Sequence, residues 1–154
     1  MTPTWYNTPL RVSFLGDAAR RWLGTPFREN SAVRGPGGGV ACHNLAAALY
    51  FETGCMACFD VPRGRVRDFL KTGAGDAIVD YLDAHLTGRF SPVVDEPPIP
   101  GDLIVMREGR VAKHVGVVLA GGDFVHVLRF RGVMLSRLDD STYQPIVAIR
   151  RPSP

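Results

Sequence analysis

The stretch KHVGVVLAGGDFVHV, residues 113–127, has the pattern of two short β-strands joined by a tight turn. Each apolar run carries one histidine, His114 in the first and His126 in the second. A two-residue turn at Gly121-Gly122 would put these histidines on opposite faces of the hairpin, because successive side chains of a strand alternate. A three-residue loop or a bulge puts both on one face, and we predict that arrangement.

The chain around this hairpin divides into a helical first half and a β-rich second half. Short apolar runs between turn residues predict four or five antiparallel strands, at residues 103–106, 115–119, 124–128, 133–135 and 146–149. A polar, proline-rich linker, residues 91–100, precedes them. Helices followed by strands predict an α+β fold, with N-terminal helices packed on an antiparallel sheet of about five strands. The length suits a single domain over residues 1–154.

Three helical segments are expected in the first half. The first covers residues 9–23, and its apolar stripe predicts one buried face made of Leu10, Phe14, Ala18 and Trp22. The second begins near Cys42 and runs to about residue 53, where Gly54 can end it. The third lies within residues 66–85.

Charge and hydropathy narrow the classes of partner. The 154 residues carry a formal net charge of +3, and no run of like charges is long enough to indicate a nucleic-acid tail. No apolar stretch reaches the length of a membrane span. The first residues resemble no signal peptide, so we expect the protein to be cytoplasmic as synthesised and to act outside the cell membrane only if exported or delivered.

Cys42 is the best candidate for a nucleophile, because it follows a glycine-rich loop and opens a helix. A helix N-terminus favours the thiolate, and its N–H groups can stabilise an oxyanion. His114 would be the base and His126 would orient it. Cys42 could instead be a buried structural thiol, or it could bind zinc with the two histidines. A cysteine nucleophile with a histidine base predicts a thiol hydrolase, which needs no cofactor.

Three further features of the sequence bear on this site. Gly38 and Gly39 belong to a loop that lets backbone approach a ligand closely. His43, next to the candidate nucleophile, could tune the thiol, but we favour a solvent-facing helix residue. Cys55 and Cys58 have the spacing of a zinc or redox pair, and without a second ligand pair we favour structural cysteines.

Taken in order, these segments resemble the NlpC/P60 family of cell-wall peptidases. The matching stretches are RRWLGTPF at 20–27, the glycine loop with Cys42, PGDLIVM at 100–106 and the hairpin at 113–127. The resemblance implies a papain-like fold and hydrolysis of amide bonds in peptidoglycan stem peptides, in many members between D-glutamate and a diamino acid. It maps the family's cysteine, histidine and polar orienter onto Cys42, His114 and His126, and it argues against zinc.

The first segment most resembles versions found in phage tails, which implies a phage-tail or secretion complex as a possible partner. The family usually has Asp-Cys-Ser where this chain has Ala41-Cys42-His43, and often Tyr where Phe27 stands. We expect Phe27, Gly38, Gly39 and His43 to line the substrate site. Two alternatives stay open: an acyltransferase or amidase on the same scaffold, and a catalytically degenerate binding domain of a tail or cell-wall complex.

Overall fold

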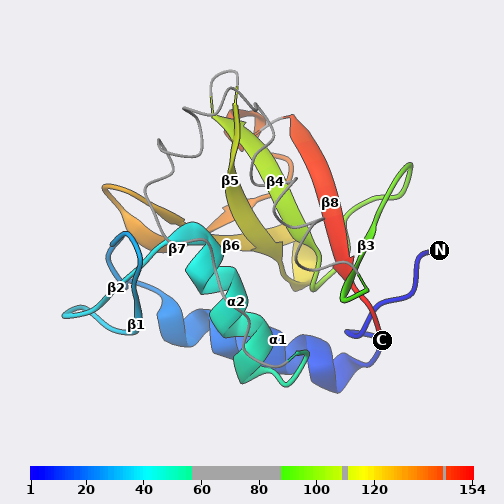
Figure 1. Cartoon of the computed structure of the whole chain (residues 1–154), viewed down its shortest axis with the longest axis horizontal. Helices are drawn as coiled ribbons and strands as arrows, with labels where there is room; N and C mark the ends of the chain where they lie inside the picture. Colours follow the sequence, from blue (N-terminus) through cyan, green and yellow to red (C-terminus); the bar gives the residue numbers. More distant parts are fainter. Residues whose placement is uncertain (57–87, 109–110, 144) are drawn as a thin grey trace.

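The structure, a computed structural model, places two helices against a curved antiparallel sheet (Figure 1). It describes residues 1–56, 88–108, 111–143 and 145–154. Helix α1 spans Pro9–Trp22 and helix α2 spans Cys42–Glu52. Both bounds agree with the prediction, and Gly54 follows α2 with a positive φ of 76°. The α+β class is confirmed, whereas the helix expected within residues 66–85 lies outside the described residues.

The main sheet has six strands in the order β3-β8-β4-β5-β6-β7. Their bounds are β3 Phe90–Pro92, β4 Leu103–Glu108, β5 Val111–Val118, β6 Asp123–Leu128, β7 Gly132–Arg137 and β8 Ile146–Pro152. The five expected strands correspond to β4 through β8. The last one returns to pair with the far side of β4, so only β4 to β7 form a meander.

Two short pairings were not expected from the sequence. Residues 90–92 form β3 and pair with β8, so the expectation that 91–100 is entirely a linker was wrong. Within the glycine-rich loop, β1 (Ala32–Val33) pairs with β2 (Gly39–Val40). Sequence periodicity did not reveal these two pairings, because the partner of a strand is decided by tertiary packing.

The β5–β6 hairpin has the register that the sequence analysis predicted. Val117 pairs with Val125 and Val118 with Phe124, and a three-residue turn, Ala120–Gly122, connects the strands. Gly121 has a φ of 79° inside this turn, a conformation that other residues adopt only with strain. The register places His114 and His126 on one face of the sheet.

Helix α1 buries only the second half of the predicted stripe, Ala18 and Trp22. Thr8 caps its start by accepting a hydrogen bond from the Arg11 N–H. Its buried residues are Leu15, Ala18, Ala19 and Trp22, whereas Leu10 and Phe14 are 62% and 50% exposed. A stripe at a strict spacing of four residues drifts by about 40° per step, so it leaves the core side over three steps.

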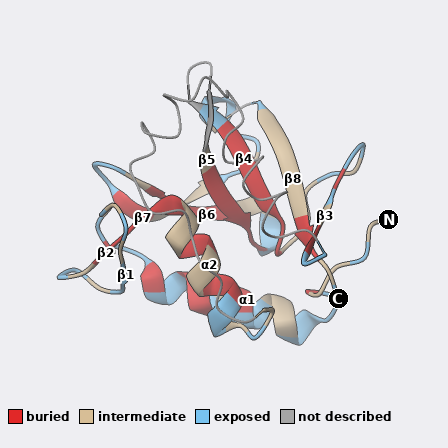
Figure 2. Ribbon diagram, in the orientation of Figure 1, coloured by how far each residue is buried: buried red, intermediate tan, exposed pale blue. Residues whose placement is uncertain are grey.

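Buried residues are concentrated in the helices and in the central strands of the sheet (Figure 2), and their side chains form two clusters on opposite faces of the sheet. The larger lies between the helices and the sheet and includes Leu15, Leu45, Leu49 and Val117. The smaller lies on the other face and includes Ile104, Met106, Val118 and Phe124. Alternation along each strand therefore sends neighbouring residues to different clusters, which fixes the register wherever both faces are covered.

A buried ion pair fastens the last strand to the sheet. Arg151 on β8 donates to both carboxylate oxygens of Asp102 at 2.9 Å, and both side chains are 0% exposed. Arg151 also contacts Glu96 at 2.6 Å, and Glu96 accepts from the N–H and hydroxyl of Thr2. The network therefore ties the N-terminal segment to the C-terminal strand.

The corrected face of α1 can be tested with two truncations of the same residue type. Leu15→Ala leaves a cavity in the main core and should lower the free energy of unfolding by about 2–5 kcal/mol. Leu10→Ala removes an exposed side chain and should change it by less than about 0.5 kcal/mol. Urea unfolding followed by circular dichroism measures both, and equal effects would restore the originally predicted face.

The buried pair can be compared with an exposed one. Asp102→Ala leaves the Arg151 guanidinium buried with Glu96 as its remaining carboxylate, and we expect a loss of about 3–5 kcal/mol. Asp17→Ala breaks a solvent-exposed contact with Arg20 and should cost less than about 1 kcal/mol. The same unfolding measurement decides. A small effect at Asp102 would mean that the network contributes little.

Candidate functional site

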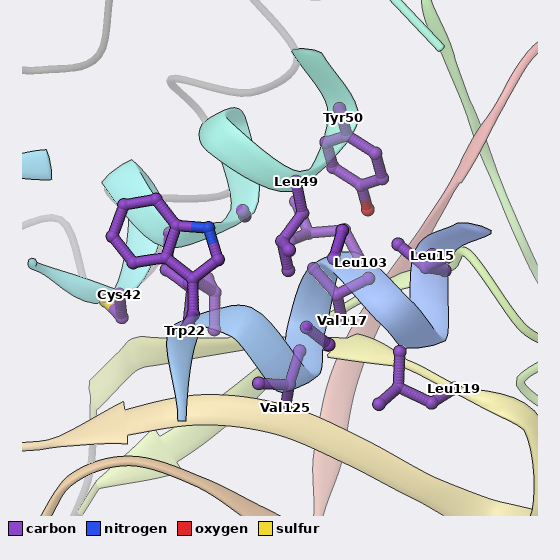
Figure 3. Close-up of a cluster of buried hydrophobic side chains, with 14 of the residues drawn as sticks. Leu15, Trp22, Cys42, Leu49, Tyr50, Leu103, Val117, Leu119 and Val125 are labelled. Atoms are coloured by element: carbon purple, nitrogen blue, oxygen red, sulfur yellow. The ribbon is translucent and has the colours of Figure 1, made fainter. Parts of the chain in front are cut away.

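The site has two parts, and the first is the start of helix α2. Cys42 is the first residue of α2, is 7% exposed and is not in a disulfide. Figure 3 shows it at the end of α2, near Trp22 and above the sheet. Ala41 occupies the N-cap position and makes no side-chain capping bond. The side chain of the cap residue therefore accepts no hydrogen bond from the N–H groups of the first turn.

The glycine-rich loop before this helix packs closely against neighbouring residues of the chain. A Cβ at Gly38 would collide with the carbonyl oxygen of Val33, and one at Gly39 with the side chain of Arg28. Phe27 forms a bridge with Val40 and packs half-buried against the main core. These positions therefore have a structural reason for their residue type, and their contact with substrate stays a prediction.

The second part is a row of three hydrogen-bonded side chains on the sheet. His114 Nε2 lies 2.7 Å from His126 Nδ1, and His126 Nε2 lies 2.7 Å from the hydroxyl of Ser136. His126 is 0% exposed, whereas His114 is half-buried. The structure thus brings His114 and His126 together, and it adds Ser136, which the sequence analysis missed.

Ser136 lies on the same face because of the β6–β7 register. His126 pairs with Met134, so Ser136 stands one diagonal step along the neighbouring strand. The alternation of β7 could have pointed to it, since any residue two positions from the partner of His126 shares its face. The sequence shows no such partner directly, because the length of the turn after β6 sets this register.

Burial makes His126 a neutral group. Desolvation, followed by the charge that His114 can carry, lowers the pKa of His126 to about 3. Its ring packs against the rings of Phe124 and Tyr143, with centroids 4.7 and 5.0 Å away. A neutral imidazole has one donor and one acceptor nitrogen, so the nitrogen that faces Ser136 and the nitrogen that faces His114 have opposite hydrogen-bonding roles.

His43 is placed differently from the favoured expectation. Its ring turns toward the nucleophile, with Nδ1 3.7 Å from the Cys42 sulfur. The residue is half-buried and its Nε2 atom is buried. The expectation of a solvent-facing side chain was therefore wrong, because the ring contacts the sulfur on one side and has its other nitrogen buried. Whether His43 contacts substrate stays a prediction.

Two further cysteines were candidates, and the structure describes one of them. Cys55 is half-buried, and burial raises the pKa of its thiol to about 11, while Cys58 lies outside the described residues. In the part of the chain that the structure describes, no three His, Cys, Asp or Glu side chains gather as metal ligands would. Among the same residues, no helix is both long and apolar enough to cross a membrane.

The neutral His126 predicts a pH dependence of stability with a definite sign. The unfolded chain binds a proton at this ring as the pH falls below about 6.5, whereas the folded protein binds it only near about 3. Stability is therefore lost through this window, by up to about 1.4 kcal/mol per pH unit. Unfolding free energies at pH 7, 6, 5 and 4 should show a shallower slope in His126→Gln. A ring that titrates near 6.5 by NMR would contradict the prediction.

Comparison with known proteins gives a family and a fold. The sequence model of the NlpC/P60 family matches residues 41–151. No curated protein matches the chain in sequence. Among solved structures, a Staphylococcus aureus protein described as similar to a lipoprotein of the NLP/P60 family has a TM-score of 0.64 at 19% identity. The alignment covers 100% of this chain and 45% of that one, so this chain spans less than half of that relative.

Two proteins of Mycobacterium tuberculosis have the same fold and differ in activity. The peptidoglycan hydrolase RipB has a TM-score of 0.56 at 16% identity, covering 97% of this chain and 68% of that one. RipD, described as a non-catalytic domain adapted to peptidoglycan binding, has a TM-score of 0.54 at 16% identity, covering 92% and 96%. Because the family model matches most of the chain, this protein belongs to the NlpC/P60 family.

Proposed function

We propose that this protein is a cysteine hydrolase that cleaves an amide bond in peptidoglycan stem peptides. The observation that carries the proposal is the row from His114 through His126 to Ser136, which orients an imidazole on the sheet against which α2 packs. Nucleophilic catalysis needs an oriented imidazole to pair with a thiol at a helix start, and we propose that His114 and Cys42 form that pair. The bond between D-glutamate and a diamino acid is the specific candidate, as the family resemblance implies.

The substrate class rests on the family and on its relatives. RipB is described as a peptidoglycan hydrolase and has the same fold. The mildly basic chain, with a net charge of +3, also suits an anionic wall polymer. A phage-tail or secretion complex as partner stays a prediction from the resemblance.

The protons of the histidine row must have one particular arrangement for this role. If His126 donates from Nε2 to the Ser136 hydroxyl, its Nδ1 accepts from the N–H at Nε2 of His114. His114 then holds a lone pair at Nδ1, the nitrogen that would take the Cys42 proton. The Ser136 hydroxyl is compatible with this arrangement, because it can accept a hydrogen bond from His126 Nε2.

The reaction then follows the double-displacement scheme of thiol hydrolases. The Cys42 thiolate attacks the amide carbonyl, and N–H groups at the start of α2 stabilise the oxyanion of the tetrahedral intermediate. His114 gives the thiol proton to the leaving amine as the C–N bond breaks. His114 next takes a proton from water, which attacks the thioester and releases the carboxylic acid and the free thiol.

A contact between Cys42 and His114 requires a particular geometry of β5. Val115 and Val117 pack in the helix-side cluster with Cys42, so alternation turns His114 to the other face, beside Met106. The β4–β5 register shifts between Met106 and Arg107, next to His114. A bulge increases local twist, and we place the Cys42–His114 contact at this twisted end of the sheet.

The function can be tested with purified peptidoglycan fragments and two variants. Wild type should release shorter peptides that mass spectrometry can assign to one bond. Cys42→Ala and His114→Asn should each lower the rate by about 10³-fold or more, because the nucleophile or its base is lost. Circular dichroism must show that both variants fold. Cleavage that survives either substitution would sink the Cys–His mechanism.

A second candidate function is binding without cleavage. RipD is a non-catalytic relative, and here Ala41 replaces the acidic residue that usually precedes the family's cysteine. In that case wild type and Cys42→Ala would sediment equally with insoluble peptidoglycan and release no peptide. The acyltransferase or amidase alternative uses the same thiolate and differs in the acyl donor and acceptor. It is favoured if Cys42 is reactive but peptidoglycan fragments stay intact.

A further inference from the structure

Two histidines, not one, can act on the candidate nucleophile. We propose that His43 is a positioning residue that donates its Nδ1–H to the Cys42 sulfur and stabilises the thiolate, separately from the His114 row. The contact of 3.7 Å between Cys42 Sγ and His43 Nδ1 is within hydrogen-bonding range for sulfur. The inference rests on the proposed function in one respect, the assignment of Cys42 as nucleophile.

Sequence adjacency does not produce this contact by itself. Consecutive residues of a helix point about 100° apart, so side chains at i and i+1 do not normally face each other. The His43 ring has turned toward Cys42 and its Nε2 atom is buried, so the ring does not point into solvent. A surface histidine that rotates freely would gain nothing from this orientation, because water satisfies both of its nitrogens.

The two departures from the family pattern act in the same electrostatic direction. The usual sequence is Asp-Cys-Ser, and here it is Ala41-Cys42-His43. Replacing the aspartate removes an anion that would oppose a neighbouring thiolate, and replacing the serine adds a group able to carry positive charge. With the N-terminus of α2 already favouring an anion, all three features stabilise the thiolate over the thiol.

The histidine row cannot supply the same interaction through its other members. His126 is buried and neutral and contacts His114 and Ser136. Other charged groups lie on elements that pack around α2. They are the exposed pair Asp17–Arg20 on α1, Asp123 with Arg137 beside β6, Arg34 with Glu52 at the far end of α2, and Glu29 in the loop before β2.

Titration of the Cys42 thiol tests the inference. The pH at which iodoacetamide alkylation of Cys42 is half-maximal reports the thiol pKa, independently of how easily the reagent reaches it. Cys55 and Cys58 are replaced by Ser so that only Cys42 reacts. His43→Phe keeps a ring but has no N–H, whereas His43→Asn keeps a donor near the Nδ1 position and cannot carry charge.

We expect His43→Phe to raise the midpoint by about one pH unit, equivalent to about tenfold slower alkylation well below it, and His43→Asn to recover part of that shift. The alkylation midpoint of His114→Asn should lie at a lower pH than that of the double variant that carries both His114→Asn and His43→Phe. An unchanged midpoint in His43→Phe would overturn the inference.

An NMR titration of His43 in the wild-type protein and in Cys42→Ala keeps the test decisive if a His43 variant fails to fold. Since the coupling between two charges is reciprocal, Cys42→Ala should lower the pKa of His43, and an unchanged pKa would overturn the inference. The two proposals fail separately. If peptidoglycan fragments stay intact while the midpoint depends on His43, the hydrolase proposal fails and this one stands. If fragments are cleaved and the midpoint ignores His43, the reverse holds.

Discussion

The candidate site depends on the register of the β5–β6 hairpin. Val117 pairs with Val125 across a three-residue turn, and this even register puts His114 and His126 on one face, 2.7 Å apart at their nearest nitrogens. A shift of one residue would send one histidine into the helix-side core and one valine out of it. The same apolar packing that stabilises the sheet therefore also positions the proposed base, so the hairpin has little freedom to change one without the other.

Much of the fold could be predicted from the sequence, because it depends on local signals. Proline, glycine and the change from helical to strand-like periodicity located α1, α2 and the strands from β4 to β8. The buried face of α1, the β3–β8 pairing and the return of β8 to β4 could not be predicted, since they depend on which surfaces meet in three dimensions. Even the exposed Leu10 has a sequence pattern that is indistinguishable from a core position.

The candidate site divides in the same way. The spacing of Cys42, His114 and His126 is visible in the sequence. The length of the glycine-containing turn between the two histidines decides whether they lie on one face. Ser136 and the inward turn of His43 were not predictable. The first depends on a second hairpin register, and the second on a side-chain rotation that packing determines. Both concern the surroundings of the reactive groups rather than the groups themselves, and these surroundings set protonation.

Burying His126 has a consequence for where charge can reside. A neutral imidazole inside the sheet, flanked by Phe124 and Tyr143, resists protonation, and desolvation is the main cause. In the proposed mechanism, the positive charge that develops is therefore carried by His114 and His43 rather than by His126. The same desolvation that keeps this ring neutral also causes the expected loss of stability in acid. A row open to water would titrate freely and would hold neither the tautomer nor the charge at the thiolate.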